Sequence, residues 1–204
     1  MYAIVEDNNI TQYINFPKSV VIGDVRYPAK IFELWTTAEK EAIGIYEIVV
    51  DKTNYKDPAY YNNTNSTYTF ADGQVTESWG TATPKRLNDE NAVDEDGNNI
   101  LDDDGNQVIN YGLKTEKKRI VKQQASGLLA PTDWYVVKAS EVADYSVPSN
   151  ITTFRADVRA KSNEMETQID ACTTVDELKA LYEYTEQEDG TITRPLPEFP
   201  KEVI

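Results

Sequence analysis

The sequence contains no histidine and a single cysteine among its 204 residues. Without histidine the chain lacks the commonest general base and the commonest transition-metal ligand, so Ser-His-Asp catalysis, Cys-His catalysis and HExxH metal sites are excluded. The lone Cys172 can form neither a disulfide within the chain nor a cysteine-rich zinc site. We therefore expect a fold that rests on packing, with no cofactor.

Long apolar runs and positive charge are also scarce. No segment approaches about 18 uninterrupted apolar residues, and Met1–Asn9 has acids where a secretion signal would have a basic region. The 20 basic and 35 acidic residues give a net charge of −15, which should repel nucleic acid and anionic membranes. We expect a protein made in the cytoplasm that binds neither nucleic acid nor membrane.

Residues 1–87 carry the signals of an α+β domain, a small mixed or antiparallel β unit with one short helix. Three short runs rich in β-branched and aromatic residues predict strands, at 2–5, 19–22 and 45–50. The pattern Thr36-Thr37-Ala38-Glu39 is a capping box and Gly44 stands where a helix would end, so the helix is expected between them. Asp72-Gly73, between two alternating β-prone runs, predicts a hairpin over 67–79.

Residues 88–113 form an acidic insertion. No Lys or Arg occurs between Arg86 and Lys114, whereas eight acids do, and an eight-residue unit repeats at 94–101 and 102–109. Two Asp-Gly-Asn turns, each followed by an apolar pair, predict a hairpin-like excursion. A calcium site is the alternative, but the EF-hand pattern fails because Ala92 stands at loop position 1 when Gly97 is placed at position 6. We favour the hairpin and expect no metal.

Residues 114–204 are predicted to be helical, with an extended, proline-rich end. A basic helix with Lys114, Lys118 and Lys122 on one face should break at Pro131. Its apolar face is expected at Leu113, Ile120, Val121, Gln124 and Leu128. The basic side chains are interpreted as a solvated face or as partners of acids within the chain, because the aromatic residues of a nucleic-acid site are missing.

A longer helix is predicted from about Pro148 to Ala171. Its apolar residues recur at helical spacing and should be buried, at Ile151, Phe154, Val158, Met165, Ile169 and Cys172. Thr174-Val175-Asp176-Glu177 is a second capping box and opens another helix. The prolines of residues 194–200 exclude a helix or a central strand there.

Two segments of the helical region carry a resemblance. Lys117-Lys118-Arg119 followed by Leu128-Leu129-Ala130-Pro131-Thr132-Asp133-Trp134 resembles the opening of the phage tail assembly chaperone family, in which a basic helix leads into an LLA-x-T-D-W signature. Further along, Phe154-Arg155-Ala156-Asp157-Val158-Arg159 is similar to that family's Y-R-Q-x-L-R-like helix. Upstream, 27–45 looks like a module that precedes the signature in tail-associated proteins of environmental phages. The resemblance covers roughly 26–50 and 114–160.

The resemblance implies a non-enzymatic structural protein of a phage tail or tail-fibre apparatus. Such a protein is made in the host cytoplasm, ends in the tail of the virion, and contacts other phage tail or fibre proteins and copies of itself, with no small-molecule substrate. The alternative is a cytoplasmic tail or tail-fibre assembly chaperone that is not retained in the particle. A carboxylate-based glycan-degrading tail enzyme is a third hypothesis, for which the sequence offers only its supply of acids.

No catalytic, cofactor-binding or metal-binding residue follows from these patterns. The candidate protein-contact residues lie in the two resembling segments, at Trp134, Tyr135, Phe154, Arg155 and Arg159. Trp134 admits two interpretations, because a large aromatic at a break between helices either anchors an interface or fills the core. We favour the core, as is usual for aromatics in a thin core.

Overall fold

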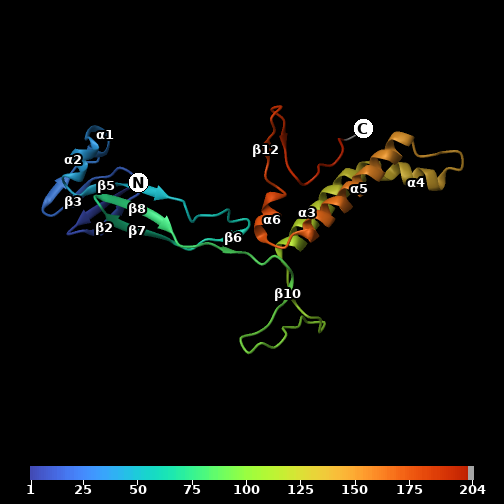
Figure 1. Ribbon diagram of the computed structural model, residues 1–204, viewed down its shortest axis with the longest axis horizontal. Helices are drawn as coiled ribbons and strands as arrows, with labels where there is room; N and C mark the ends of the chain where they lie inside the picture. Colours follow the sequence, from blue (N-terminus) through green and yellow to red (C-terminus); the bar gives the residue numbers. More distant parts are fainter. Residues whose placement is uncertain (202–204) are drawn as a thin grey trace. The chain divides into compact units, whose positions relative to one another are not determined.

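The computed structural model describes residues 1–201 and divides into two units, one from Met1 to Thr83 and one that begins at Pro84 (Figure 1). The first unit is a β-sheet with short helices, and the second is mainly helical. The predicted α+β class is thereby confirmed. The acidic insertion belongs to the second unit.

A five-stranded sheet forms the first unit, in the order β2-β1-β5-β8-β7. The strands are β1 (Tyr2–Glu6), β2 (Asn9–Ile14), β5 (Ile45–Asp51), β7 (Ser66–Ala71) and β8 (Gln74–Trp79). Neighbouring strands are antiparallel except β5 and β8, which are parallel. The rings of Tyr13 on β2 and Tyr68 on β7 have centroids 4.7 Å apart. The sheet therefore curls until its two edge strands meet.

Both faces of strand β1 are buried, because its side chains alternate between two clusters. Ile4 packs with Ile14, Val20, Ile31, Phe32 and Ile45. Ala3 and Val5 pack on the other face with Ile48 and Val75. The first cluster is closed by helix α1 (Ile31–Leu34) and by the hairpin of β3 (Val20–Ile22) and β4 (Val25–Tyr27). Helix α2 (Thr37–Glu41) places Lys40 against Tyr2 at the edge of the cluster. The sequence predicted one short helix here, and the structure has two.

The predicted turns of this unit are confirmed. At the Asp72-Gly73 turn between β7 and β8 both residues have positive φ, 50° and 74°, as a type I′ hairpin requires. Thr36 and Glu39 form the expected capping box at the start of α2. Gly44 has φ 84°, and a Cβ there would lie 2.6 Å from the Val5 carbonyl oxygen. Only glycine fits where α2 ends against β1. A short ladder of β6 (Tyr61–Asn62) and β9 (Thr83–Pro84) follows.

The acidic insertion closes on itself as a ring. Strands β10 (Glu90–Asn91) and β11 (Ile109–Asn110) pair at its base. Beyond them, three residues eight positions apart are joined head to tail: Ala92 N–H donates to the Val108 carbonyl at 2.8 Å, Val108 N–H to Ile100 at 2.9 Å, and Ile100 N–H to Ala92 at 2.9 Å. The Gln107 amide nitrogen lies 2.8–3.2 Å from the same three carbonyl oxygens. In place of the predicted hairpin, the insertion forms a closed circuit of three backbone hydrogen bonds that carries two turns.

Two long antiparallel helices organise the second unit. Its elements are α3 (Leu113–Leu129), the 3-10 turn η1 (Ala130–Thr132), α4 (Asp133–Glu141), α5 (Ser149–Ala171), α6 (Val175–Ala180) and the small hairpin of β12 (Thr185–Glu186) and β13 (Ile192–Thr193). All six residues of the predicted apolar stripe on α5 are buried. Phe154 and Val158 pack on Ala125 of α3, with Phe199 of the C-terminal segment beside them. The long helix and its burial are therefore confirmed.

Smaller predictions for this unit are confirmed or corrected. The Thr174 capping box opens α6, and residues 194–200 contain neither helix nor strand, both as predicted. On α3 the buried residues are Val121 and Ala125, whereas Ile120 is exposed. Of the five predicted residues, Val121 is buried, Leu113 and Leu128 are half-buried, and Ile120 and Gln124 are exposed. The buried face of α3 is therefore rotated toward the lysines, which make ion pairs with α5.

Candidate functional site

The chain changes direction at the junction of α3 and α4. Helix α3 ends at Leu129 and is followed by one 3-10 turn that has Pro131 in its first half. Proline is tolerated there because the first residues of a helical turn have no intrahelical acceptor for an N–H. The predicted break at Pro131 is confirmed, but a new helix, α4, begins at Asp133 directly afterwards.

Arg155 of α5 holds this junction. One nitrogen of its guanidinium, Nη1, donates to the Leu129 carbonyl at 3.0 Å and to Oγ1 of Thr132, and it lies 2.8 Å from Oδ1 of Asp133. The Thr132 hydroxyl in turn donates to the Leu129 carbonyl at 2.7 Å. Thr132 is fully buried and Arg155 is 8% exposed, so the bonds of Arg155 to Leu129 and Thr132 are shielded from water, whereas the side chain of Asp133 is 60% exposed. The contacts of Arg155 with Leu129, Thr132 and Asp133 are called the Arg155 joint below, and they fix where α4 starts.

The joint also connects the two segments that carry the family resemblance. Thr132 and Asp133 belong to the first segment and Arg155 to the second. Residue spacing alone does not predict this contact, because Leu129 and Arg155 are 26 positions apart in the sequence. A buried arginine needs acceptors, and the polar Thr-Asp pair after a proline break was the available signal.

Helix α4 has no buried residue. Trp134 is 52% exposed, and Val136, Val137 and Val142 are exposed to a similar degree; these four residues are called the α4 surface below. The ring of Trp134 lies against the half-buried Tyr135, with centroids 3.9 Å apart. The interpretation of Trp134 as a core residue is therefore wrong, because no element within residues 1–201 buries a side chain of α4.

The remaining predicted contact residues divide between core and surface. Phe154 and Arg155 are buried, the first in the α3–α5 core and the second in the joint. They act inside the chain, contrary to their prediction as contact residues, because the helical stripe of α5 faces α3. Arg159 is exposed, and its Nη1 donates to the Arg155 carbonyl at 3.3 Å. Trp134, Tyr135 and Arg159 thus remain at the surface.

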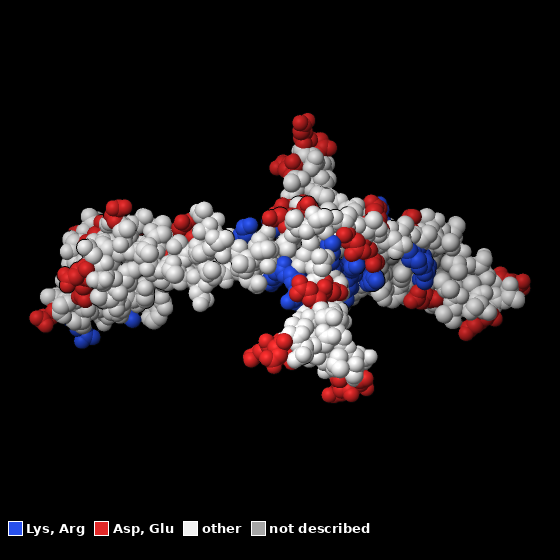
Figure 2. All heavy atoms as spheres, turned by 60° about the horizontal axis from the view of Figure 1, so that its bottom comes forward, with Lys and Arg blue, Asp and Glu red and all other residues white. Residues whose placement is uncertain are grey.

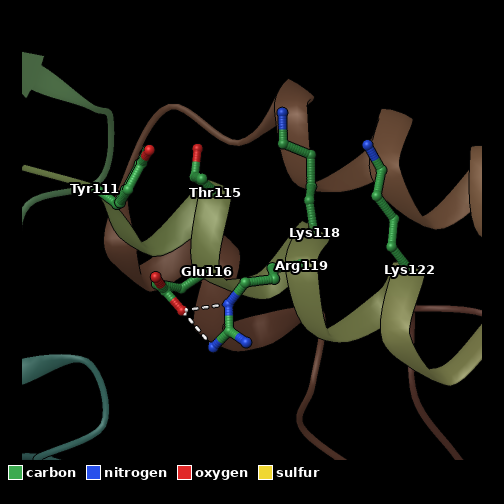
Figure 3. A pocket seen from close by; sticks show the side chains of 6 residues that line it. All are labelled: Tyr111, Thr115, Glu116, Lys118, Arg119 and Lys122. Carbon is green, nitrogen blue, oxygen red and sulfur yellow. Dashed lines mark hydrogen bonds and ion pairs between the residues drawn. The ribbon is translucent and has the colours of Figure 1, made fainter. Parts of the chain in front are cut away.

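A basic groove lies along α3 (Figure 3). It encloses about 470 Å³ and is lined by Tyr111, Thr115, Glu116, Lys118, Arg119 and Lys122. Nη2 and Nε of Arg119 both donate to Oε2 of Glu116, three positions earlier on α3, at 2.8 and 3.1 Å. Lys118 pairs with Asp170 at 2.7 Å and Lys122 with Glu166 at 3.2 Å, both on α5.

These ion pairs confirm that the basic run finds acids within the chain. Two lysines four positions apart meet two acids four positions apart in reversed order, as antiparallel helices require. That matched spacing was visible in the sequence and could have predicted the packing of α3 on α5. Each pair is partly exposed, so its contribution to stability is about 1 kcal/mol or less.

The acidic turns bind their own backbone. Oδ1 of Asp94 accepts from the N–H groups of Asp96 and Asn98, at 3.0 and 2.8 Å, and Oδ1 of Asp102 accepts from Asp104 and Asn106 at the same distances. These bonds favour the ionised form and lower the pKa of both carboxyl groups. Within residues 1–201 no group of three or more acids, cysteines or histidines is placed to hold a metal ion.

Cys172 lies in the apolar stripe, as expected. Burial raises the pKa of its thiol, so the reactive thiolate is disfavoured.

Comparison with known proteins finds no relative of this chain. No family model matches the chain, and no curated protein or solved structure matches it either. Among the helices of residues 1–201 none has both the length and the apolar character to cross a membrane.

Proposed function

We propose that this chain is a non-enzymatic structural protein of a phage tail or tail-fibre apparatus, which acts through contacts with other tail or fibre proteins. The observation that carries the proposal is the Arg155 joint. The two segments that resemble the tail assembly chaperone family are far apart in the sequence, and this buried contact joins them beside the apolar packing of Leu128 and Leu129 on Phe154. A chance resemblance in two separate segments would not require them to form one structural feature.

The α4 surface is the proposed contact region. Short helices gain most of their stability from packing an apolar face, yet α4 exposes Trp134, Val136 and Val137 to solvent, and the exposed Val142 follows its last residue. Tryptophan contributes a large contact area with few rotatable bonds and is enriched among the residues that dominate binding energy. The Arg155 joint would present this surface in a fixed orientation, which lowers the ordering cost of association.

The test is mass spectrometry of purified phage particles from an infection with the wild-type chain and with Trp134→Ala. We expect the wild-type protein in particles and the variant in the lysate only, with an unchanged melting temperature of the purified variant. The matched control is Ile192→Ala, which also removes an exposed apolar side chain from the second unit and should be incorporated normally.

Two outcomes would contradict the proposal. A wild-type protein that is abundant in lysate and absent from particles would replace the structural role by that of an assembly chaperone. A Trp134→Ala variant that folds and is incorporated normally would remove the α4 surface from the contact.

A further inference from the structure

Four acids of the insertion have side chains that make no hydrogen bond or ion pair within residues 1–201. In each turn the first aspartate is engaged with the backbone, whereas the next two acids project outward, Glu95 and Asp96 in one turn and Asp103 and Asp104 in the other. These four residues are called the acidic tips. In Figure 2 the red side chains stand at the ends of the protruding insertion.

The insertion holds its tips rigidly. The ring through Ala92, Ile100 and Val108 fixes the two turns relative to each other. Asp89 ties the base to α3, since Gly112 N–H and the Thr115 hydroxyl donate to its two oxygens at 2.7 and 2.9 Å. A rigid acidic tip loses little conformational freedom when it meets a partner, which favours docking.

The basic groove of α3 has the complementary charge. Three of its six lining residues are cationic and one is acidic, and the two lysines are also paired with Asp170 and Glu166 of α5. The side chains of Arg119 and Lys122 are 64% and 67% exposed, so their ion pairs with Glu116 and Glu166 leave much of each cation open to solvent. Exposed pairs of this kind are weak and can be shared with a further carboxylate.

We propose that the basic groove of α3 binds an acidic tip from a second copy of this chain. Charge complementarity supports this occupant: the chain carries both halves, and within residues 1–201 none of the four tip carboxylates pairs with a cation of its own α3. The contact specifies how copies meet in the proposed structural role, and rests on that role for its biological meaning.

The two halves of this contact are different surfaces. Groove and tip lie on the same chain, so each copy offers one of each to its neighbours. Such a head-to-tail contact closes into a ring or continues as a filament, in contrast to a two-fold dimer.

Charge reversal tests the proposal on the purified full chain. The tip variant carries Glu95→Lys, Asp96→Lys, Asp103→Lys and Asp104→Lys, and the groove variant carries Arg119→Glu and Lys122→Glu. Self-association is measured by sedimentation velocity at about 0.15 M ionic strength, where the Debye length is about 8 Å and charges remote from the contact are screened. We expect the wild type to associate and each variant alone to lose affinity at least about tenfold.

The decisive measurement is the sedimentation velocity of a mixture of the two variants. In the mixture the reversed groove meets the reversed tips, and the unaltered groove of the tip variant meets the unaltered tips of the groove variant. The mixture should therefore form a complex with equal numbers of the two variants, which neither variant forms alone. This rescue also shows that both variants are folded. The control is Glu186→Lys with Glu188→Lys, which changes two exposed acids on the β12–β13 hairpin and should leave association unchanged.

Four results would overturn the proposal. They are a wild-type chain that stays monomeric at every concentration, variants that associate like the wild type, a mixture that does not form the complex, and a control that weakens association as much as the tip variant does. Because the readout is self-association in solution, its failure leaves the particle-incorporation test of the proposed function intact.

Discussion

Replacing Arg155 by alanine should destabilise the helical unit strongly. The substitution removes a buried charged donor from the Leu129 carbonyl and the Thr132 hydroxyl, which are in water-shielded positions. Hydrogen bonds to charged groups contribute about 1.5–3 kcal/mol each, but the Thr132 hydroxyl keeps its own bond to Leu129, which reduces the loss. The Asp133 partner is 60% exposed and adds about 1 kcal/mol at most. We expect a loss of about 2–4 kcal/mol.

Urea unfolding followed by far-ultraviolet circular dichroism would measure this loss, because the helical signal comes mainly from the second unit. Arg159→Ala is the matched control: it removes an exposed arginine one turn away and should change the free energy of unfolding by no more than about 0.5 kcal/mol. A double-mutant cycle with Thr132→Val should give a coupling energy of about 1 kcal/mol or more. Equal effects of Arg155→Ala and Arg159→Ala would refute the role of the joint.

Three further predictions concern other parts of the chain. Gly112→Ala should lower the melting temperature of the helical unit in a thermal scan, because the new Cβ would lie 2.5 Å from backbone atoms of Leu87 and Asn88; an unchanged value would mean that the base of the insertion shifts freely. Cys172 should react with a thiol reagent only after unfolding, since it is buried with a raised pKa, and rapid labelling of the native chain would contradict this. Hydrogen bonds from Thr173 lower the pKa of Glu177 in the folded chain below its ordinary value of 4.5, so the stability it contributes is complete above that value and is lost as the pH falls through the lowered pKa. In acid titrations Glu177→Gln should weaken this pH dependence, and an unaltered titration would exclude the hydrogen bonds from Thr173 as its source.

Local signals in the sequence were sufficient for most individual elements. The two capping boxes, the Asp72-Gly73 turn and the stripe of α5 each involve residues within one or two turns of one another, so their chemistry is readable from spacing. No element was predicted where α4 lies, because the short run from Tyr135 to Lys138, with β-branched Val136 and Val137, is ambiguous between strand and helix. In the structure Pro131 occupies the first turn of a new helical segment.

Long-range relations were beyond local reasoning. The parallel pairing of β5 with β8 and the pairing of β1 with β5 depend on which strands meet in space. The candidate contact residues show the same limit, since Phe154, Arg155 and Arg159 lie within six positions yet end in the core, in a joint and in solvent. Only the packing of α5 on α3 separates these three environments.

The ring in the acidic insertion also constrains how this segment can vary in length. Most sequence repeats stack as open arrays, so adding one unit merely lengthens the array. Here the N–H of each of Ala92, Ile100 and Val108 donates to the carbonyl of one of the other two, and its own carbonyl accepts from the N–H of the third. The amide nitrogen of Gln107 lies at the centre, within reach of all three carbonyls. A third copy of the eight-residue unit would add a fourth residue to this closed circuit and would widen the centre beyond the reach of one amide. Changes in length should therefore be tolerated at the turn tips, by single residues, and excluded for whole repeats.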